Sequence, residues 1–430
     1  MATSTTASSV LRDFDQYQEK DVNLEATASS SPSGRKNVLF TPKFQASTKN
    51  NPMCGICFPQ WISILRQRWK VIEFRVYWRR LVFITLLSIV NSLLGVLDYI
   101  FYESKVEQAQ IHPRPVFILG HPRTGTTLLQ SLLAMDTERF GICSTFCAGF
   151  PSSFLSFEGV GKILFQGVID DHRPMDNVPL GFDLPQEDEL ATNVLSAGTS
   201  PYMPLWFMQQ EPDFRPYYAF DDRLDTDSDE YLEPSRMAAA RKQWIDSFLH
   251  LLRKLTVREE KERNSHSSTM HSKPRRLLLK SPVHTARMPL LLQLFPDAQF
   301  VYVHRHPYDI LRSAMHMADT TYWYTYLNTP SDDQIMKFIL RQYEILFDRY
   351  ESGRRQIEEI QQQTQQQQSL VEVSFDELSQ RPIETVRRIY KALGWTMTSS
   401  FHESLVEELV TVHSYQRNAH KELPDRLKRI

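Results

Sequence analysis

The sequence predicts an α/β fold in which a central parallel sheet carries helices on both faces. Short apolar runs that suit buried strands occur at residues 115–119, 276–279, 299–303 and 370–373. Between them lie longer segments whose apolar residues recur with helical spacing. Strands that alternate with helices are typical of a parallel sheet, because each crossover brings the chain back to begin the next strand at the same edge.

The predicted helices follow these strands in order. They cover residues 126–135, about 234–257, a segment that begins near 307, and 381–393. Residues 258–275 are charged and polar, which predicts a solvated loop, and the glutamine-rich run 356–368 suits either a helix extension or a loop. The proline-rich and aromatic stretch from about 140 to 235 is expected to form much of the substrate-side surface.

Composition limits the classes of function. The chain has 430 residues, a formal net charge of −2 and four cysteines. Such a balance gives no overall attraction to nucleic acid, and so few cysteines form no disulfide scaffold. Cys54 and Cys57 lack a second pair at zinc spacing, so no metal is expected. We expect a disordered tail over 1–52, a basic and hydrophobic segment over 60–105, and one catalytic domain over 111–424.

The segment from Leu81 to Tyr102 predicts membrane contact. Between Leu81 and Leu97 no residue is charged, and twelve of seventeen are Leu, Ile, Val or Phe. Those twelve favour insertion into a bilayer by about 4 to 7 kcal/mol. A single transmembrane span, a helix lying in the membrane interface and a buried core helix all remain open, because the uncharged run is shorter than about 18 residues.

Basic residues precede this segment and predict that its N-terminal side faces the cytosol. They are Arg66, Arg68, Lys70, Arg75, Arg79 and Arg80. The expected location is therefore membrane-associated, and a single span would make the chain a protein of the Golgi or endoplasmic reticulum with a cytosolic N-terminus. A peripheral cytoplasmic protein is the alternative.

The loop after the first strand predicts an anion site. Residues 120–127 read GHPRTGTT and lead directly into a helix. A strand, a glycine-bounded turn and a helix N-terminus gather backbone N–H groups around one point, as phosphate sites do. The spacing of Gly120 and Gly125 matches the loop of nucleoside triphosphatases. The alternation of strands and helices around it predicts three layers, α/β/α. Thr126 replaces the lysine that reaches β- and γ-phosphates, which disfavours triphosphate chemistry.

A second motif predicts another anion contact. Arg305 follows the strand 299–303, where open parallel sheets bind ligands, and Ser313 comes eight residues later. Ser313 falls about two turns into the following helix, from which its hydroxyl can turn toward the same ligand. An arginine that only caps the helix or pairs with Asp309 is the alternative.

With both motifs in place, the chain resembles the sulfotransferases that use 3′-phosphoadenosine-5′-phosphosulfate (PAPS), in their bacterial-type branch with a PRTGTT loop. The resemblance runs from about 113 to 420 and predicts the P-loop-like fold. It implies that the first loop holds the 5′-phosphosulfate, and that Arg305 and Ser313 hold the 3′-phosphate. The donor residues it implies are Arg123, Thr124, Gly125, Thr126, Thr127, Arg305 and Ser313, with a weaker contact from Arg417 in the C-terminal tail.

Sulfuryl transfer needs a base for the acceptor hydroxyl and positive charge over the transferring group, and no metal. Lys280, at the end of the second strand, suits the second task. His284 and Glu187 are the candidate bases, and the sequence does not rank Glu187 against its neighbours Asp188 and Glu189. The expected acceptor is a hydroxyl of a small molecule or lipid. A small-molecule kinase and a non-catalytic nucleotide-binding protein are the alternatives.

Overall fold

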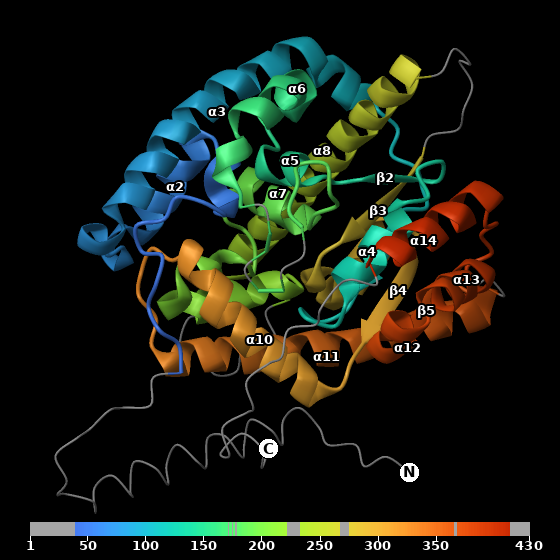
Figure 1. Cartoon of the computed structure of the whole chain (residues 1–430). Helices are drawn as coiled ribbons and strands as arrows, with labels where there is room; N and C mark the ends of the chain where they lie inside the picture. The colour runs from blue at the N-terminus through green and yellow to red at the C-terminus, as the bar shows by residue number, and fades with distance from the viewer. Residues whose placement is uncertain are drawn as a thin grey trace, which may run out of the picture.

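In a computed structural model, the chain forms a five-stranded parallel sheet between helical layers (Figure 1). The structure describes residues 39–170, 172–173, 175–176, 179–221, 233–266, 275–364 and 368–412. The sheet has the order β2-β3-β1-β4-β5. Its strands are β1 (Val116–Leu119), β2 (Phe140–Ile142), β3 (Arg276–Lys280), β4 (Gln299–His304) and β5 (Leu370–Ser374).

The helices of the catalytic part alternate with these strands. They are α4 (Thr126–Ala134), α5 (Thr145–Gly149), α6 (Phe154–Leu164), α7 (Asp188–Leu195), α8 (Pro234–His266), α9 (Met288–Leu294), α10 (Pro307–Thr321), α11 (Asp332–Thr364), α12 (Phe375–Gln380), α13 (Pro382–Ala392) and α14 (Ser399–Val412). Before them come α2 (Phe58–Arg68) and the long α3 (Phe74–Gln108).

Successive side chains of the central strand β1 point to opposite faces of the sheet, and this explains the three layers. Val116 and Ile118 point to one face of the sheet and pack in a core with α4, α13 and α14. Phe117 and Leu119 point to the other face and pack with α8 and α9. Both faces of β1 are therefore buried, as its continuous apolar run predicts. The three-layer α/β/α fold with a central parallel sheet is confirmed.

The strand order also fixes where a ligand can bind. The chain leaves β1 and later returns to form β3 on one side of it and β4 on the other. In open parallel sheets the crevice at such a reversal, beyond the carboxyl ends of the strands, receives the ligand. The loop after β1, the end of β3 and the end of β4 all lie at this edge.

The structure corrects two expectations about individual segments, decides between two alternatives for a third, and adds a strand. Residues 258–266 are helical, not a loop, and continue α8, where the two buried charges at the start of this segment are paired: Arg258 with Glu158 at 2.7 Å, and Glu259 with Arg275 at 2.9 Å. Residues 356–364 extend α11. Residues 39–52, expected in a disordered tail, are ordered. The N–H groups of Leu39 and Phe40 donate to Asp332, and Phe40 is buried. The short strand β2 was not predicted.

Helix α3 is attached to the domain by polar contacts from its inner face. Asp98 accepts hydrogen bonds from the N–H groups of Leu155 and Ser156 in the first turn of α6 and so caps that helix. The Lys254 ammonium lies 2.8 Å from the same carboxylate, and both side chains are only 4% exposed. A buried ion pair thus links α3, α6 and α8.

Replacing one member of this pair should cost more stability than replacing both. Asp98→Ala leaves Lys254 buried without its counter-ion, and we expect it to lower the free energy of unfolding by about 3 to 5 kcal/mol. The double variant Asp98→Ala/Lys254→Met should recover part of that loss, because no buried charge remains. Urea unfolding followed by fluorescence measures both. Equal losses in the single and double variants would contradict the importance of the pair.

Candidate active site

The loop between β1 and α4 has a backbone that requires its two glycines. Gly120 has φ = 145° and Gly125 has φ = 96°, a region that side chains with a Cβ rarely adopt. A Cβ at Gly120 would lie 2.7 Å from the carbonyl oxygen of Val303, and one at Gly125 would lie 2.4 Å from the ring of Phe375. Arg123 adopts φ = 76°, which is strained for a non-glycine residue and is typical of functional sites.

Hydrogen bonds within the loop fix its shape. The N–H and the hydroxyl of Thr124 both donate to the carbonyl of His121, at 3.2 and 2.8 Å. The N–H of Gly120 donates to the Thr285 hydroxyl at 2.9 Å. The Thr124 hydroxyl therefore holds the loop together, whereas the resemblance implied a contact with the donor. The first turn of α4 leaves the N–H groups of Thr126 and Thr127 without intrahelical acceptors, as an anion site requires.

The structure brings the two predicted anion motifs together. Arg123 Nε donates to Ser313 Oγ at 2.9 Å, and Arg305 Nη1 donates to the carbonyl of Arg123 at 3.1 Å. The Arg305 guanidinium also lies 4.3 Å from the centre of the Phe375 ring, which orients it by a cation–π contact. The loop after β1 and the segment after β4 thus form one positively charged site.

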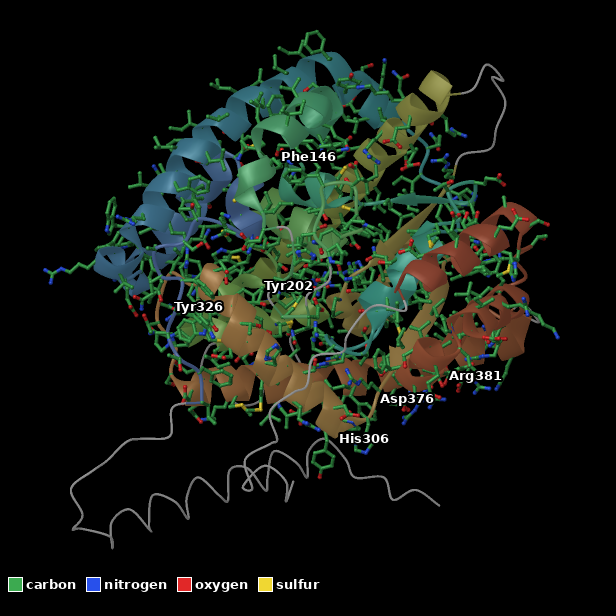
Figure 2. The ribbon with its side chains drawn as sticks, in the orientation of Figure 1. Phe146, Tyr202, His306, Tyr326, Asp376 and Arg381 are labelled. Atoms are coloured by element: carbon green, nitrogen blue, oxygen red, sulfur yellow. The ribbon has the colours of Figure 1, made fainter. Side chains whose placement is uncertain are left out.

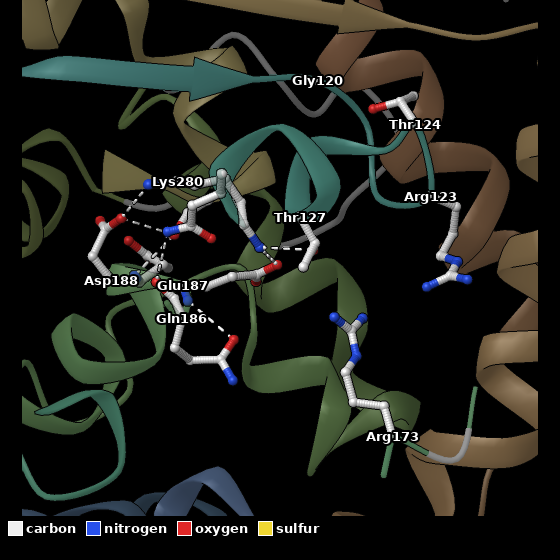
Figure 3. Close-up of polar contacts among 12 residues, drawn as sticks. Gly120, Arg123, Thr124, Thr127, Arg173, Gln186, Glu187, Asp188 and Lys280 are labelled. Carbon is white, nitrogen blue, oxygen red and sulfur yellow. Dashed lines mark hydrogen bonds and ion pairs between the residues drawn. The ribbon is translucent and has the colours of Figure 1, made fainter. Parts of the chain in front are cut away.

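A third cation at this site, Arg173, was not predicted. Its guanidinium lies 3.3 Å from Asp176 Oδ2, and the Arg123 guanidinium lies 2.9 Å from the same oxygen. Figure 3 shows the Arg173 side chain pointing toward the region beneath Thr127. Arg173 and Asp176 lie close together in the sequence, but only the fold places them beside the loop.

Lys280 and Glu187 form an ion pair next to the loop (Figure 3). Lys280 Nζ lies 2.8 Å from Glu187 Oε1 and 3.3 Å from Thr127 Oγ1. Burial lowers the pKa of Lys280, while Glu187 opposes that shift and Arg173 adds to it. The ammonium is buried, whereas the Glu187 side chain keeps 23% of its surface exposed. Of the two partners, Glu187 is therefore the one whose side chain is open to solvent.

Tyr202 is the second partner of Glu187, and it too was not predicted. Its hydroxyl donates to Glu187 Oε2 at 2.5 Å. Burial and the nearby Glu187 carboxylate raise the pKa of Tyr202 well above its usual value, so the phenol stays protonated. Figure 2 shows Tyr202 in the interior of the molecule. The two oxygens of Glu187 are thus oriented by one cation and one neutral donor.

The structure ranks the three neighbouring acids that the sequence left open. Asp188 is fully buried and accepts from the N–H of Lys280 at 3.0 Å. Glu189 is also fully buried and pairs with Arg287 at 2.7 Å. Asp188 and Glu189 have buried partners, whereas the Glu187 side chain pairs with the Lys280 ammonium, which lies beside Thr127.

His284 does not reach the loop. It is fully buried in the short 3-10 helix Pro282–Arg287, where its Nε2 lies 2.6 Å from Asp188 Oδ2. Its ring packs against Phe117 and Phe248 in the core. The 3-10 helix that follows β3 is buried along its whole length, so the spacing of four residues from Lys280 carries His284 into the core. Arg417 lies outside the described residues.

Comparisons with known proteins agree with this architecture. The model of the sulfotransferase family matches residues 115–399. The chain is 27% identical over 369 residues to the omega-hydroxy-beta-dihydromenaquinone-9 sulfotransferase Stf3 of Mycobacterium bovis and of Mycobacterium tuberculosis, which covers 85% of this chain and 84% of each relative.

Solved structures show the same fold. Sulfotransferase STF1 of Mycobacterium tuberculosis aligns with a TM-score of 0.55 and 16% identity, covering 84% of this chain and 87% of that one. Sulfotransferase STF9 of Mycobacterium avium aligns with a TM-score of 0.52 and 18% identity, covering 90% and 93%. The family match spans more than half of the chain. The protein therefore belongs to the sulfotransferase family and is an enzyme of the sulfuryl-transferring class.

Proposed function

We propose that this sulfotransferase moves the sulfuryl group of PAPS to a hydroxyl of a lipid acceptor, with Glu187 as the general base. The observation that carries the proposal is the contact between the two anion motifs, in which Arg123 reaches Ser313 and Arg305 reaches the backbone of Arg123. A donor with phosphate groups at both its 5′ and 3′ positions matches two such motifs in one site.

On binding, the phosphate groups of the donor would replace contacts that the site residues make with one another in the free protein. The turn at Gly125, Thr126 and Thr127 offers N–H groups to the 5′-phosphosulfate. Arg305 and Ser313 lie beside this turn and suit the 3′-phosphate. Arg123 now pairs with Asp176, and a bound phosphate would take the place of that carboxylate. The cost of the strained Arg123 backbone is thus offset by ligand contacts.

Transfer then follows from the positions of Glu187 and Lys280. Glu187 takes the proton of the acceptor hydroxyl while the acceptor oxygen forms a bond to sulfur, and the bond from sulfur to the oxygen of the 5′-phosphate breaks. The Lys280 ammonium, beside Thr127, stabilises the negative charge that develops on that leaving oxygen. Tyr202 holds the carboxylate in place and stays neutral.

Two observations support a lipid acceptor. The two mycobacterial relatives are named for omega-hydroxy-beta-dihydromenaquinone-9, which bears a hydroxyl on an isoprenoid lipid. In this chain, an apolar cluster links Tyr202, the partner of Glu187, through Trp206 and Phe207 to the inner face of α3 at Leu81 and Ile84. The relatives are bacterial and do not support an address in the Golgi or endoplasmic reticulum.

Glu187→Gln tests the base. Because the amide cannot take a proton, we expect kcat to fall about 10² to 10⁴-fold, while the Kd of 3′-phosphoadenosine-5′-phosphate changes little. The assay uses radiolabelled donor and an omega-hydroxylated menaquinone or a host lipid extract. Glu384→Gln, at an exposed acid of α13, is the matched control. A kcat within threefold of the wild type would exclude Glu187 as the base.

Gly125→Ala tests the loop. The added methyl group meets Phe375 and demands a strained backbone, so we expect the Kd of 3′-phosphoadenosine-5′-phosphate to rise about 10 to 100-fold. Isothermal titration calorimetry measures this Kd. Gly159→Ala in α6 is the control, since no atom lies within 4 Å of its added Cβ. Unchanged affinity in Gly125→Ala would show that the donor binds elsewhere.

The alkaline limb of the pH profile tests Lys280. Burial lowers the pKa of Lys280, so its ammonium loses a proton as pH rises through a value below the usual lysine range. Activity should fall over that interval. Lys280→Arg keeps its charge to higher pH, and its alkaline limb should move upward even though kcat is reduced. Identical alkaline limbs in both proteins would assign the ionisation to another group.

A further inference from the structure

Helix α3 presents a continuous apolar face to the outside of the molecule. Every exposed residue from Val82 to Phe101 is apolar or aromatic, and the stripe includes Leu86, Leu93 and Ile100, which are 62%, 67% and 65% exposed. Helix α6 packs beside α3 and adds Ile163 and Leu164, which are 75% and 66% exposed (Figure 1). Soluble proteins rarely expose so many neighbouring large apolar side chains.

We propose that this face of α3 and α6, here called the lipid face, docks in the plane of an anionic bilayer, so that α3 lies along the membrane surface and does not cross it. By length, the roughly 20 residues from Val82 to Phe101 would reach about 30 Å, which is enough for a span. The orientation is decided by the inner face of the helix.

The inner face of α3 is tied to the folded domain by polar groups. Arg80 donates to the carbonyls of Trp323 and Phe44 at 2.9 and 3.0 Å. Asn91 donates to the carbonyl of Cys54 at 2.5 Å. Asp98 pairs with Lys254 of α8. A spanning helix would expose these buried polar groups to lipid or carry the domain into the bilayer, and either cost is several kcal/mol.

The residues at and just before the amino-terminal end of α3 indicate the headgroup charge of the bilayer that this face would bind. Trp69 and Trp78 are 59% and 55% exposed, as expected at the level of lipid headgroups. Exposed cations accompany them at Lys70, Arg75 and Arg79. Glu73 is the acidic residue of this region, and its carboxylate faces inward, where it accepts hydrogen bonds from Thr329. Exposed aromatic rings beside cations that form no ion pair with the residues the structure describes match anionic phospholipids.

This docking surface depends on neither the proposed donor nor the proposed base. A helix with one lipid face and one protein face is the arrangement of interfacial membrane proteins. The same hydrophobic core that packs behind α3 at Leu81 and Ile84 also contains Tyr202, so docking would hold the bilayer against the part of the domain that carries Glu187 and its partner.

Vesicle flotation of the full chain tests the lipid face. We expect binding to vesicles of phosphatidylcholine with phosphatidylserine, and weaker binding to phosphatidylcholine alone. Leu86→Glu/Leu93→Glu should reduce the bound fraction at least tenfold while the thermal midpoint stays within a few degrees. The control Phe347→Glu/Val406→Glu replaces two exposed apolar residues of α11 and α14 and should bind as the wild type does. No vesicle binding, or equal binding by both double variants, would overturn the proposal.

Two further measurements separate the other arrangements. In a Cys57→Ser background, Arg75→Cys and Gln108→Cys mark the two ends of α3. A membrane-impermeant maleimide added outside vesicles should label both, and protection of one end would show a span. Sedimentation equilibrium without lipid should show a monomer. A dimer that Leu86→Glu/Leu93→Glu dissociates, together with no vesicle binding, would assign the face to a second copy of the chain.

Discussion

The carboxylate of Asp188 connects the parts of the active site. It accepts the N–H of Lys280 at the end of β3 and lies 2.6 Å from His284 Nε2, which fixes the start of α7 to the sheet. Burial alone would raise the pKa of Asp188, but His284 and these hydrogen bonds outweigh it and hold the pKa below its usual value. The charged carboxylate thereby keeps Glu187, one residue earlier, beside Lys280. His284 thus helps to hold Asp188 in position. Its residue type alone suggests a role in proton transfer.

The sequence predicts well what depends on local patterns. Four apolar runs became β1, β3, β4 and β5, and the glycine-bounded turn became the loop before α4. It fails where a side chain's direction is set by distant packing. Glu187, Asp188 and Glu189 are adjacent in the chain, yet only the contacts of α7 with β3 and α8 separate an accessible carboxylate from two buried ones.

The dependence of side-chain environment on distant packing also explains why the prediction from sequence was incomplete for α8 and α3. The charges of residues 258–266 indicate a solvated loop by composition, but the segment is helical and its buried Arg258 is paired with Glu158. In α3 the apolar residues predict membrane contact, whereas its polar residues disfavour a transmembrane helix. The structure shows that Asn91 and Asp98 share one side, where they hold the helix to the protein. The apolar face that we propose to dock on a bilayer and the face that is attached to the domain are therefore opposite faces of one helix.

The claim that two anion motifs form a single site for a doubly phosphorylated nucleotide is tested most directly by calorimetric titration of the wild-type chain with three ligands. The ligands are 3′-phosphoadenosine-5′-phosphate, adenosine 5′-monophosphate, and ATP with magnesium. The first should bind at least about 10-fold more tightly than the second, since one well-placed charge contact is worth about 1.5 to 3 kcal/mol. Equal affinity for the first two ligands, or a preference for ATP with magnesium, would contradict the account.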